Sequence, residues 1–288
     1  MNTQTPTTTQ TTTPTTTTPT TLILGGTGKT GSRVARRLTA RGLPVRIASR
    51  AGAPPFDWND ESTWAAALRG VGALYLAYYP DLAVPGAAQH IRALARQAAD
   101  GGVKRIVLLS GRGEPQVLPA EEGVRDSGAA FTILRAAWFA QNFSEGYLLD
   151  PVLAGEVAFP AGDVAEPFLD VDDIADIAAA ALTTDRHAGM IYELTGPRLL
   201  TFADAVAEIA RASGREIRYV PITSAQYGAA LAEVMPAEDA GFLTELFRYV
   251  LDGHNAHLTD GVERALGRRP RDFADFARDA AAAGAWSR

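Results

Sequence analysis

A run of glycines near the start of the chain has the composition of a loop that holds phosphate groups. It lies between a short apolar run and an amphipathic stretch, and its spacing is G-x-x-G-x-x-G instead of G-x-G-x-x-G. In a dinucleotide-binding loop one glycine allows the turn, one lets the backbone approach the pyrophosphate, and one lets the helix pack on the strand. The same three needs are met here. The predicted nucleotide contacts are Gly25, Thr27, Gly28, Lys29, Thr30 and Gly31.

The end of the second apolar run predicts which nicotinamide cofactor is bound. An acidic residue about 20 positions after the motif would bind a ribose 2′-hydroxyl and favour NAD. This chain has Ser49 and Arg50 there, and a guanidinium can pair with a 2′-phosphate and stack on adenine. The predicted cofactor is therefore NADP(H), with a plain surface arginine as the alternative. Asp57 is expected to accept from the adenine amino group, unless it is an ordinary surface aspartate, and Ala77 and Tyr78 are expected to line the cofactor.

Aromatic side chains follow the later predicted strands, at the edge where parallel sheets bind ligands. They are expected to form a flat, apolar pocket for a small molecule, with ordinary core packing as the alternative. Tyr79 and Ser110 lie at two of these strand ends and are the predicted catalytic residues. The predicted substrate contacts are Trp138, Phe139, Asn142 and Phe143.

Strands and helices are predicted to alternate along the first half of the chain. The expected strands are Thr21–Gly26, Pro44–Ser49, Ala73–Ala77, Arg105–Leu109 and Phe131–Leu134, with a possible further strand at Phe56–Trp58. The expected helices are Gly31–Leu38, Glu61–Leu68, one that begins near Pro85, and Glu121–Asp126. This order predicts an α/β fold of Rossmann type, a doubly wound, mostly parallel sheet with a small, mainly helical C-terminal substrate region.

The character of the chain changes at two places. Residues 1–20 consist almost entirely of Thr, Pro and Gln and are expected to be a disordered tail. Residues 21–150 are expected to form the NADP-binding Rossmann domain, and residues 151–288 the remainder of the core together with the substrate-binding region. Asp170 or Asp172 is expected to cap a helix, and the sequence from Thr201 to Asp204 predicts a capping box.

The composition excludes several classes of protein. The 288 residues are 47% hydrophobic and 21% charged, which is typical of a globular chain. The chain has 27 Lys and Arg residues and 33 Asp and Glu residues, which gives a net charge of −6. It has no run of basic residues that would bind nucleic acid or anionic lipid. There is no cysteine, and no apolar segment of about 20 residues predicts a membrane span. We expect a cytoplasmic monomer or homodimer that binds a small molecule and no metal.

From Leu22 onward the chain resembles the NmrA-like atypical short-chain dehydrogenases/reductases, and within them the ergot-alkaloid festuclavine and agroclavine dehydrogenases. The resemblance implies an NADP(H)-binding Rossmann domain and direct hydride transfer to a C=N, C=C or quinone-like acceptor in secondary metabolism. The stretches that carry it are Gly25–Gly31, Ala48–Arg50, Phe56–Trp58, Val103–Ser110, Trp138–Glu145, Phe168–Ala175 and Leu194–Thr201.

The chain departs from the wider superfamily in its acid group. Ordinary members use Tyr-x-x-x-Lys, but the only lysines here are Lys29 and Lys104, and neither follows a tyrosine at that spacing. Without this dyad, acceptors that are already cations, such as iminium ions, need only hydride and positioning. The predicted function is reduction of a small, aromatic acceptor of iminium, enone or quinone type. Glu121 and Glu122 are expected to be solvated charges on a polar helix face, with attraction of a cationic acceptor as the alternative. A non-enzymatic NAD(P)-binding redox sensor and a non-redox cyclase or isomerase remain the alternative functions.

Overall fold

A parallel sheet forms the centre of the computed structural model, which describes residues 19–287. Apart from its last two positions, the tail expected at residues 1–20 lies outside the described residues. The six strands of the sheet lie in the order β2-β1-β3-β4-β5-β8. Their bounds are β1 (Thr20–Leu24), β2 (Val45–Ala48), β3 (Val71–Leu76), β4 (Arg105–Gly111), β5 (Ala130–Ala136) and β8 (Met190–Leu194). All neighbouring pairs are parallel, which confirms the predicted Rossmann-type sheet.

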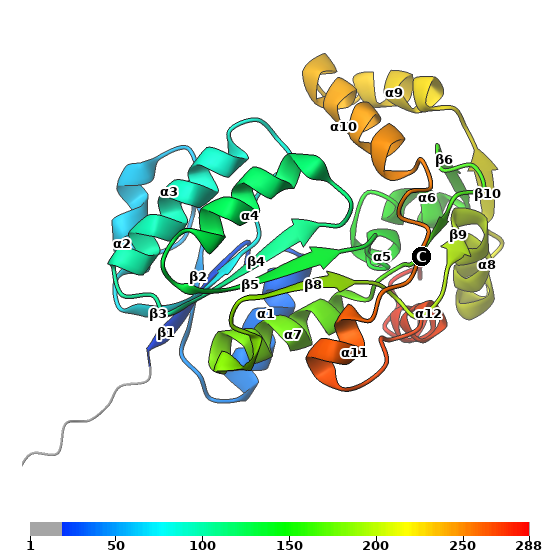
Figure 1. Ribbon diagram of the computed structural model, residues 1–288. Helices are drawn as coiled ribbons and strands as arrows, with labels where there is room; N and C mark the ends of the chain where they lie inside the picture. Colours follow the sequence, from blue (N-terminus) through cyan, green and yellow to red (C-terminus); the bar gives the residue numbers. More distant parts are fainter. Residues whose placement is uncertain (1–18, 288) are drawn as a thin grey trace, which may run out of the picture.

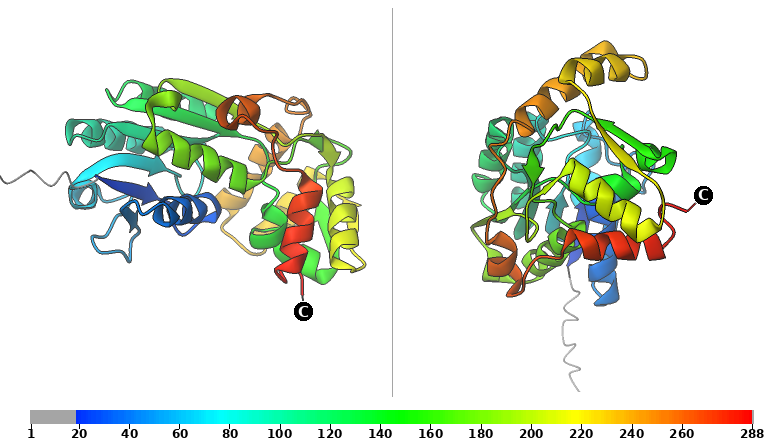
Figure 2. Two further views of the ribbon diagram at one scale, coloured as in Figure 1. Left: turned by 90° about the horizontal axis from the view of Figure 1, so that it is seen from below. Right: turned by 90° about the vertical axis from the view of Figure 1, so that its right-hand side faces the viewer.

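Helices cover both faces of this sheet (Figures 1 and 2). One face carries α2 (Trp64–Leu68), α3 (Ala87–Asp100) and α4 (Leu118–Arg125), and the other carries α1 (Lys29–Ala40), α7 (Val171–Thr183) and α11 (Gly261–Leu266). In β1, Leu22 and Leu24 pack on the first face while Ile23 packs on the second. A strand that is buried on both faces needs such an unbroken apolar run, which is why β1 could be read from sequence.

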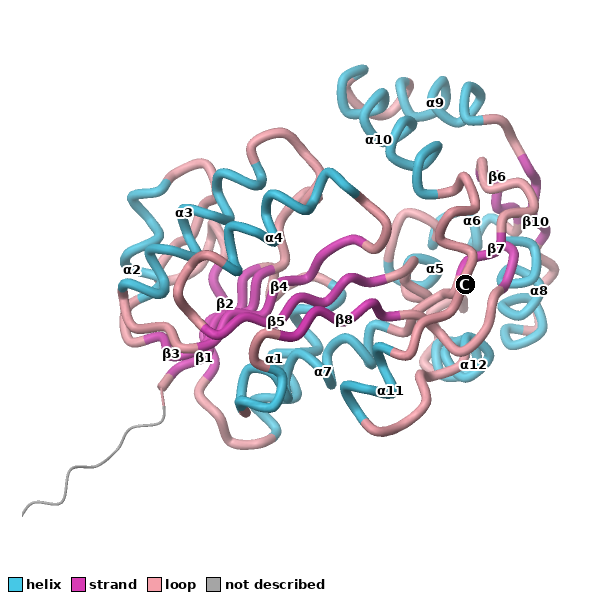
Figure 3. The backbone as a smooth tube through the Cα atoms, viewed as in Figure 1, coloured by secondary structure: helices cyan, strands magenta, loops and turns pink. Residues whose placement is uncertain are grey.

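A second part of the molecule lies beyond the carboxyl ends of β4, β5 and β8 (Figures 1 and 3). It contains two small sheets, a parallel pair of β6 with β10 and an antiparallel pair of β7 with β9. Its elements are α5 (Asn142–Glu145), α6 (Leu149–Ala154), β6 (Glu156–Phe159), β7 (Ala165–Glu166), β9 (Leu200–Thr201), α8 (Phe202–Ser213), β10 (Arg218–Pro221), α9 (Ser224–Ala232), α10 (Ala237–Val250) and α12 (Phe273–Ala282). The 3₁₀ turns of the chain are η1 (Glu61–Thr63), η2 (Pro115–Val117) and η3 (Asp185–His187).

Two predicted helix starts are confirmed by their side-chain hydrogen bonds. Asp170 caps α7 by accepting from the Asp172 backbone N–H at 2.8 Å. Thr201 and Asp204 form a reciprocal capping box at the start of α8. Both satisfy backbone N–H groups that the first turn of a helix leaves without partners.

The prediction of a possible strand at Phe56–Trp58 is wrong. The segment has no place in the sheet, since β2 is the edge strand and Asp57 forms only an isolated bridge to Asp60. Instead Phe56 and Trp58 pack edge to face, with ring centroids 4.9 Å apart, and the Trp64 indole donates to the Asp57 carbonyl at 2.7 Å. The rings are therefore buried by a turn folded under α2.

Across residues 19–287 the structure contains no helix that combines the length and the apolarity of a bilayer crossing.

Candidate nucleotide and acceptor site

The glycine loop joins β1 to α1, and two of its glycines are required by the fold itself. Gly25 has φ +75°, a left-handed conformation that side chains rarely adopt. A Cβ on Gly31 would overlap the Gly25 carbonyl oxygen, so Gly31 lets α1 pack on the end of β1. Gly28 differs, because it is extended with φ −84° and ψ 177°, and a Cβ there would meet only the Gly25 carbonyl at 3.3 Å. The absence of a side chain at Gly28 therefore leaves room for an approaching ligand.

The N-terminus of α1 is open and suited to an anion. Gly28, the N-cap, gives no side-chain hydrogen bond, and the first turn has no acidic residue. Thr27 and Gly28 are exposed. The Gly28 N–H donates to the Gly25 carbonyl at 2.9 Å, so the donors open to a ligand are the N–H groups of the first turn of α1, at the positive end of the helix dipole. Thr30 is buried and points into the core. Lys29 reaches toward the loop after α5, where its Cε would lie 3.1 Å from a Cβ on Gly146, and burial lowers the pKa of Lys29.

Arg50 follows the end of β2, next to the glycine loop in the sheet order. Its side chain is exposed, and no described residue forms a hydrogen bond or ion pair with it. Ser49 orders this strand end, since its carbonyl accepts from the backbone N–H groups of Gly52 at 2.9 Å and Phe56 at 3.0 Å. The guanidinium is thus held at the carboxyl edge of the sheet with all its donors available.

The other predicted cofactor residues lie around the same edge. Ala77 contacts the glycine loop, since a Cβ on Gly25 would lie 3.0 Å from the Ala77 Cβ. The Asp57 carboxylate accepts from a backbone N–H two residues on and is half-buried. Tyr78 packs on Trp58 with ring centroids 4.6 Å apart, and its hydroxyl bonds His90 Nδ1 at 2.7 Å. The phenol of Tyr78 therefore faces an aromatic cluster and not the open edge.

The two predicted catalytic residues lie in unlike surroundings. Tyr79 is 73% exposed beyond the end of β3. Ser110 is buried in β4 and donates to Glu121 at 2.7 Å. Glu121 is itself 2% exposed and forms an ion pair with Arg135 at 2.6 Å. The expected solvated face at Glu121 is therefore wrong, because Arg135 and Ser110 compensate the charge inside the fold.

An aromatic cluster that the sequence did not predict lies beyond the end of β5, where α10 meets the small sheets. We call it the acceptor-side cluster. Its rings have centroids 5.2–6.1 Å apart, and Tyr147 keeps 44% of its surface exposed. The rings are tilted or edge-on to one another and Phe159 is fully buried, so Tyr147 is the member that offers an exposed ring to a ligand. The members are Trp138, Tyr147, Phe159, Tyr227 and Phe247.

Of the predicted substrate contacts, only Trp138 belongs to this cluster. Asn142 begins α5 and is half-buried, while Phe139 packs against the core and pairs with Leu169 in an isolated bridge. Phe143 is fully buried and its ring packs on Phe168, 5.7 Å away. The structure also keeps Tyr78 in a separate cluster, so the expected strand-end aromatics do not line one common pocket.

Polar groups tie the second part of the molecule to the end of β4. Arg112 is 3% exposed and donates to the Asn255 carbonyl at 2.8 Å. Glu166 in β7 is 2% exposed, and one of its oxygens has no hydrogen-bond partner among the described residues. Burial raises the pKa of Glu166 to about 7, opposed by the charges of Arg112 and His254.

The raised pKa of Glu166 predicts that the free energy of unfolding decreases as the pH rises. The pKa of Glu166 is higher in the folded chain than the ordinary value of 4.5. The contribution of its protonated form to the free energy of unfolding is therefore complete below about pH 4.5. It is lost as the pH rises through 7, by about 3 kcal/mol. We expect Glu166→Gln to melt at a higher temperature than the wild type at pH 8 and at the same temperature at pH 5. The exposed Glu233→Gln is the control. An equal shift at both pH values would contradict the prediction.

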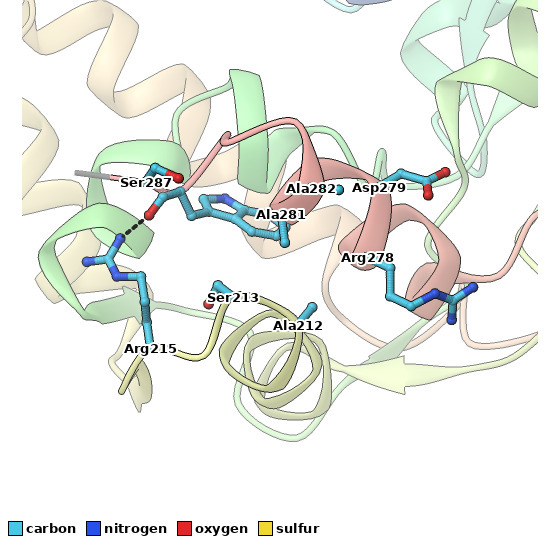
Figure 4. A pocket seen from close by; sticks show the side chains of 9 residues that line it. Ala212, Ser213, Arg215, Arg278, Asp279, Ala281, Ala282 and Ser287 are labelled. Carbon is cyan, nitrogen blue, oxygen red and sulfur yellow. Dashed lines mark hydrogen bonds between the residues drawn. The ribbon is translucent and has the colours of Figure 1, made fainter.

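No group of three or more His, Asp and Glu side chains within residues 19–287 is arranged to hold a metal ion. A groove of about 820 Å³ lies between α8 and α12, where the Arg215 guanidinium donates to the Trp286 carbonyl (Figure 4). It contains none of the predicted site residues.

The chain matches no protein-family model. It is 32% identical over 284 residues to an NAD(P)H azoreductase of Xenophilus azovorans, which covers 91% of this chain and 98% of the relative. It is 33% identical over 282 residues to an agroclavine dehydrogenase of Claviceps fusiformis, which covers 90% and 96%.

Solved structures with the same fold include an NADPH-dependent quinone oxidoreductase from Escherichia coli in complex with NADPH. It has a TM-score of 0.74 and 24% identity, covering 90% of this chain and 99% of that chain. A mutant of NmrA has a TM-score of 0.64 and 16% identity, covering 91% and 94%. NmrA thus shares the fold. The sequence relatives confirm the resemblance to the agroclavine and festuclavine dehydrogenases, and the chain belongs to their family.

Proposed function

We propose that the protein is an NADPH-dependent reductase that transfers hydride to a small aromatic acceptor of iminium, enone or quinone type. The observation that carries the proposal is the exposed guanidinium of Arg50 beside the open N-terminus of α1. A 2′-phosphate and a pyrophosphate are the two groups that these donors fit. Relatives named as an NAD(P)H azoreductase and as agroclavine dehydrogenases support an NAD(P)H-dependent oxidoreductase.

The nucleotide would lie across the carboxyl edge of the sheet, at the switch point between β1 and β3 where the strand order reverses. The N–H groups of the first turn of α1 would hold the pyrophosphate in the space that Gly28 leaves open, and Arg50 would hold the 2′-phosphate. Bound NADPH supplies the hydride. Because the ends of β4 and β5 border the other half of the edge, the acceptor would lie between them and the acceptor-side cluster, and Tyr147 would offer an exposed ring for stacking.

Position and desolvation are the contributions that this chain makes to such a transfer. Of the two predicted catalytic residues, Ser110 already donates its hydroxyl hydrogen bond to Glu121. Ser110 would therefore help to fix the position of the end of β4. Tyr79 is exposed close to the same edge. Hydride acceptors that bind as cations need no acid, and bringing the two reactants together is the main requirement.

The proposal is tested with purified protein, NADPH and a panel of an iminium compound, a quinone and an azo dye. We expect saturable NADPH binding and an acceptor-dependent loss of absorbance of the reduced nicotinamide. NADPH binding without turnover of any acceptor would instead favour a nucleotide sensor, and product formed without consumption of NADPH would favour a cyclase or isomerase. Absence of saturable binding at millimolar NADPH would contradict all three.

A further inference from the structure

The turn after β4 holds a carboxyl group that no other residue uses. Glu114 follows Gly111, the last residue of β4, by three positions and caps η2 through its backbone. Its side chain folds back onto the strand end, where a Cβ on Gly111 would overlap the carboxyl oxygen. Neither oxygen accepts a hydrogen bond from a described residue, and both remain accessible at the half-buried site. A glycine at 111 is thus what allows the carboxyl to lie on the edge of the sheet.

The charges around Glu114 leave its carboxyl without a cation. Burial raises the pKa of Glu114 to about 7, and the negative charge of Asp81, in the loop after β3, acts in the same direction. Arg112 donates instead to carbonyl groups of the 255–257 segment. His254 bonds the neighbouring Asp252 through Nδ1 and a carbonyl of the turn through Nε2. Glu114 is therefore protonated in part of the molecules near neutral pH.

We propose that the Glu114 carboxyl donates the proton that accompanies reduction of acceptors that become anions when they take up hydride. This role rests on the proposed function. Hydride passes from NADPH to a quinone and leaves NADP⁺ and a hydroquinone anion. The Glu114 O–H bond breaks as its proton moves to that oxyanion, and the carboxylate regains a proton from water. The role is the one that Tyr-x-x-x-Lys has in ordinary superfamily members.

The test compares two acceptors in single turnovers with saturating NADPH. A neutral quinone needs a proton, whereas a cationic triphenylmethane dye takes hydride alone. We expect Glu114→Gln to slow quinone reduction on the order of 100-fold and to change dye reduction less than threefold. Glu263→Gln, at an exposed carboxylate of α11, is the control and should leave both rates unchanged. The NADPH affinity and the melting temperature of each variant are measured to check that it is folded.

The pH profile gives a second readout, which a merely structural role would not change. Quinone reduction by the wild type should fall as the pH rises through about 7, because only the protonated acid can donate. Asp81→Asn removes a neighbouring negative charge and should move that midpoint to lower pH, and Glu114→Gln should abolish it.

Four results would overturn this role. Equal losses with both acceptors would make Glu114 structural, and a higher dye KM with unchanged quinone reduction would make the carboxyl a binding group for cations. A wild type that binds NADPH and reduces neither acceptor would overturn both this role and the proposed function, whereas turnover that is insensitive to Glu114→Gln overturns this role alone.

Discussion

Replacing Gly28 with valine is expected to abolish the binding of NADPH and of NADH while the protein stays folded. The extended backbone at Gly28 accepts any residue, and the nearest atom to an added Cβ is the Gly25 carbonyl at 3.3 Å. A branched side chain would instead occupy the space through which a pyrophosphate reaches the backbone N–H groups. Each lost charge-assisted hydrogen bond costs about 2 kcal/mol, so we expect the Kd for both nucleotides to rise at least ~100-fold.

The measurement is a fluorescence or calorimetric titration of each nucleotide, with a thermal melt of every variant. Gly241→Val serves as the matched control, because Gly241 lies in α10 with no atom within 4 Å of an added Cβ. Gly31→Val should by contrast destabilise the fold, since its side chain would overlap the backbone of the loop. Normal nucleotide affinity in a folded Gly28→Val protein would show that the pyrophosphate lies elsewhere.

Replacing Arg50 with aspartate is expected to reverse the preference for the phosphorylated cofactor. The variant loses a guanidinium that has no partner within the described chain, and it places a carboxylate where the 2′-phosphate would lie. We expect NADPH binding to weaken by about 3 kcal/mol, on the order of 100-fold in Kd. NADH binding should change much less, because its ribose carries a hydroxyl that a carboxylate can accept from.

Arg69→Asp makes the same change of charge at the opposite edge of the sheet, because Arg69 is exposed and precedes β3 whereas Arg50 follows β2. It should leave both affinities unchanged. The ratio of the two dissociation constants is the quantity to compare, and a ratio that does not change in Arg50→Asp would remove this residue from cofactor selection.

The predictable part of the fold is the part that local chemistry determines. The apolar run of β1, the glycine loop and the capping box at Thr201 each follow from interactions within a few residues. The turn at Phe56–Trp58 does not, because aromatic residues bury their rings equally well in a strand or under a helix. The hydrogen bond from Trp64 to the Asp57 carbonyl, which fixes the turn, forms only in the folded chain.

The candidate site divides in the same way. Gly28 and Arg50 could be proposed from the sequence because nucleotide recognition in this fold uses a local loop and the next strand end. Trp138 was predicted from its place at a strand end, but the rest of the acceptor-side cluster was missed because residues such as Phe247 reach it from distant segments that no local pattern marks. Glu121 was misplaced for a related reason, since its burial depends on an ion pair with Arg135 on a neighbouring strand.

The route of the chain between β5 and β8 bears on how such enzymes diversify. Phe139 and Leu169 pair in a bridge before the core helix α7 begins, so the excursion over residues 140–168 departs and returns at adjacent anchors. Lengthening a loop of such an excursion adds little closure entropy, and the glycine loop and Arg50, to which we assign the nucleotide, follow strands on the far side of the sheet. Selection can therefore remodel which molecule is reduced, residue by residue, while the machinery that delivers electrons is inherited unchanged.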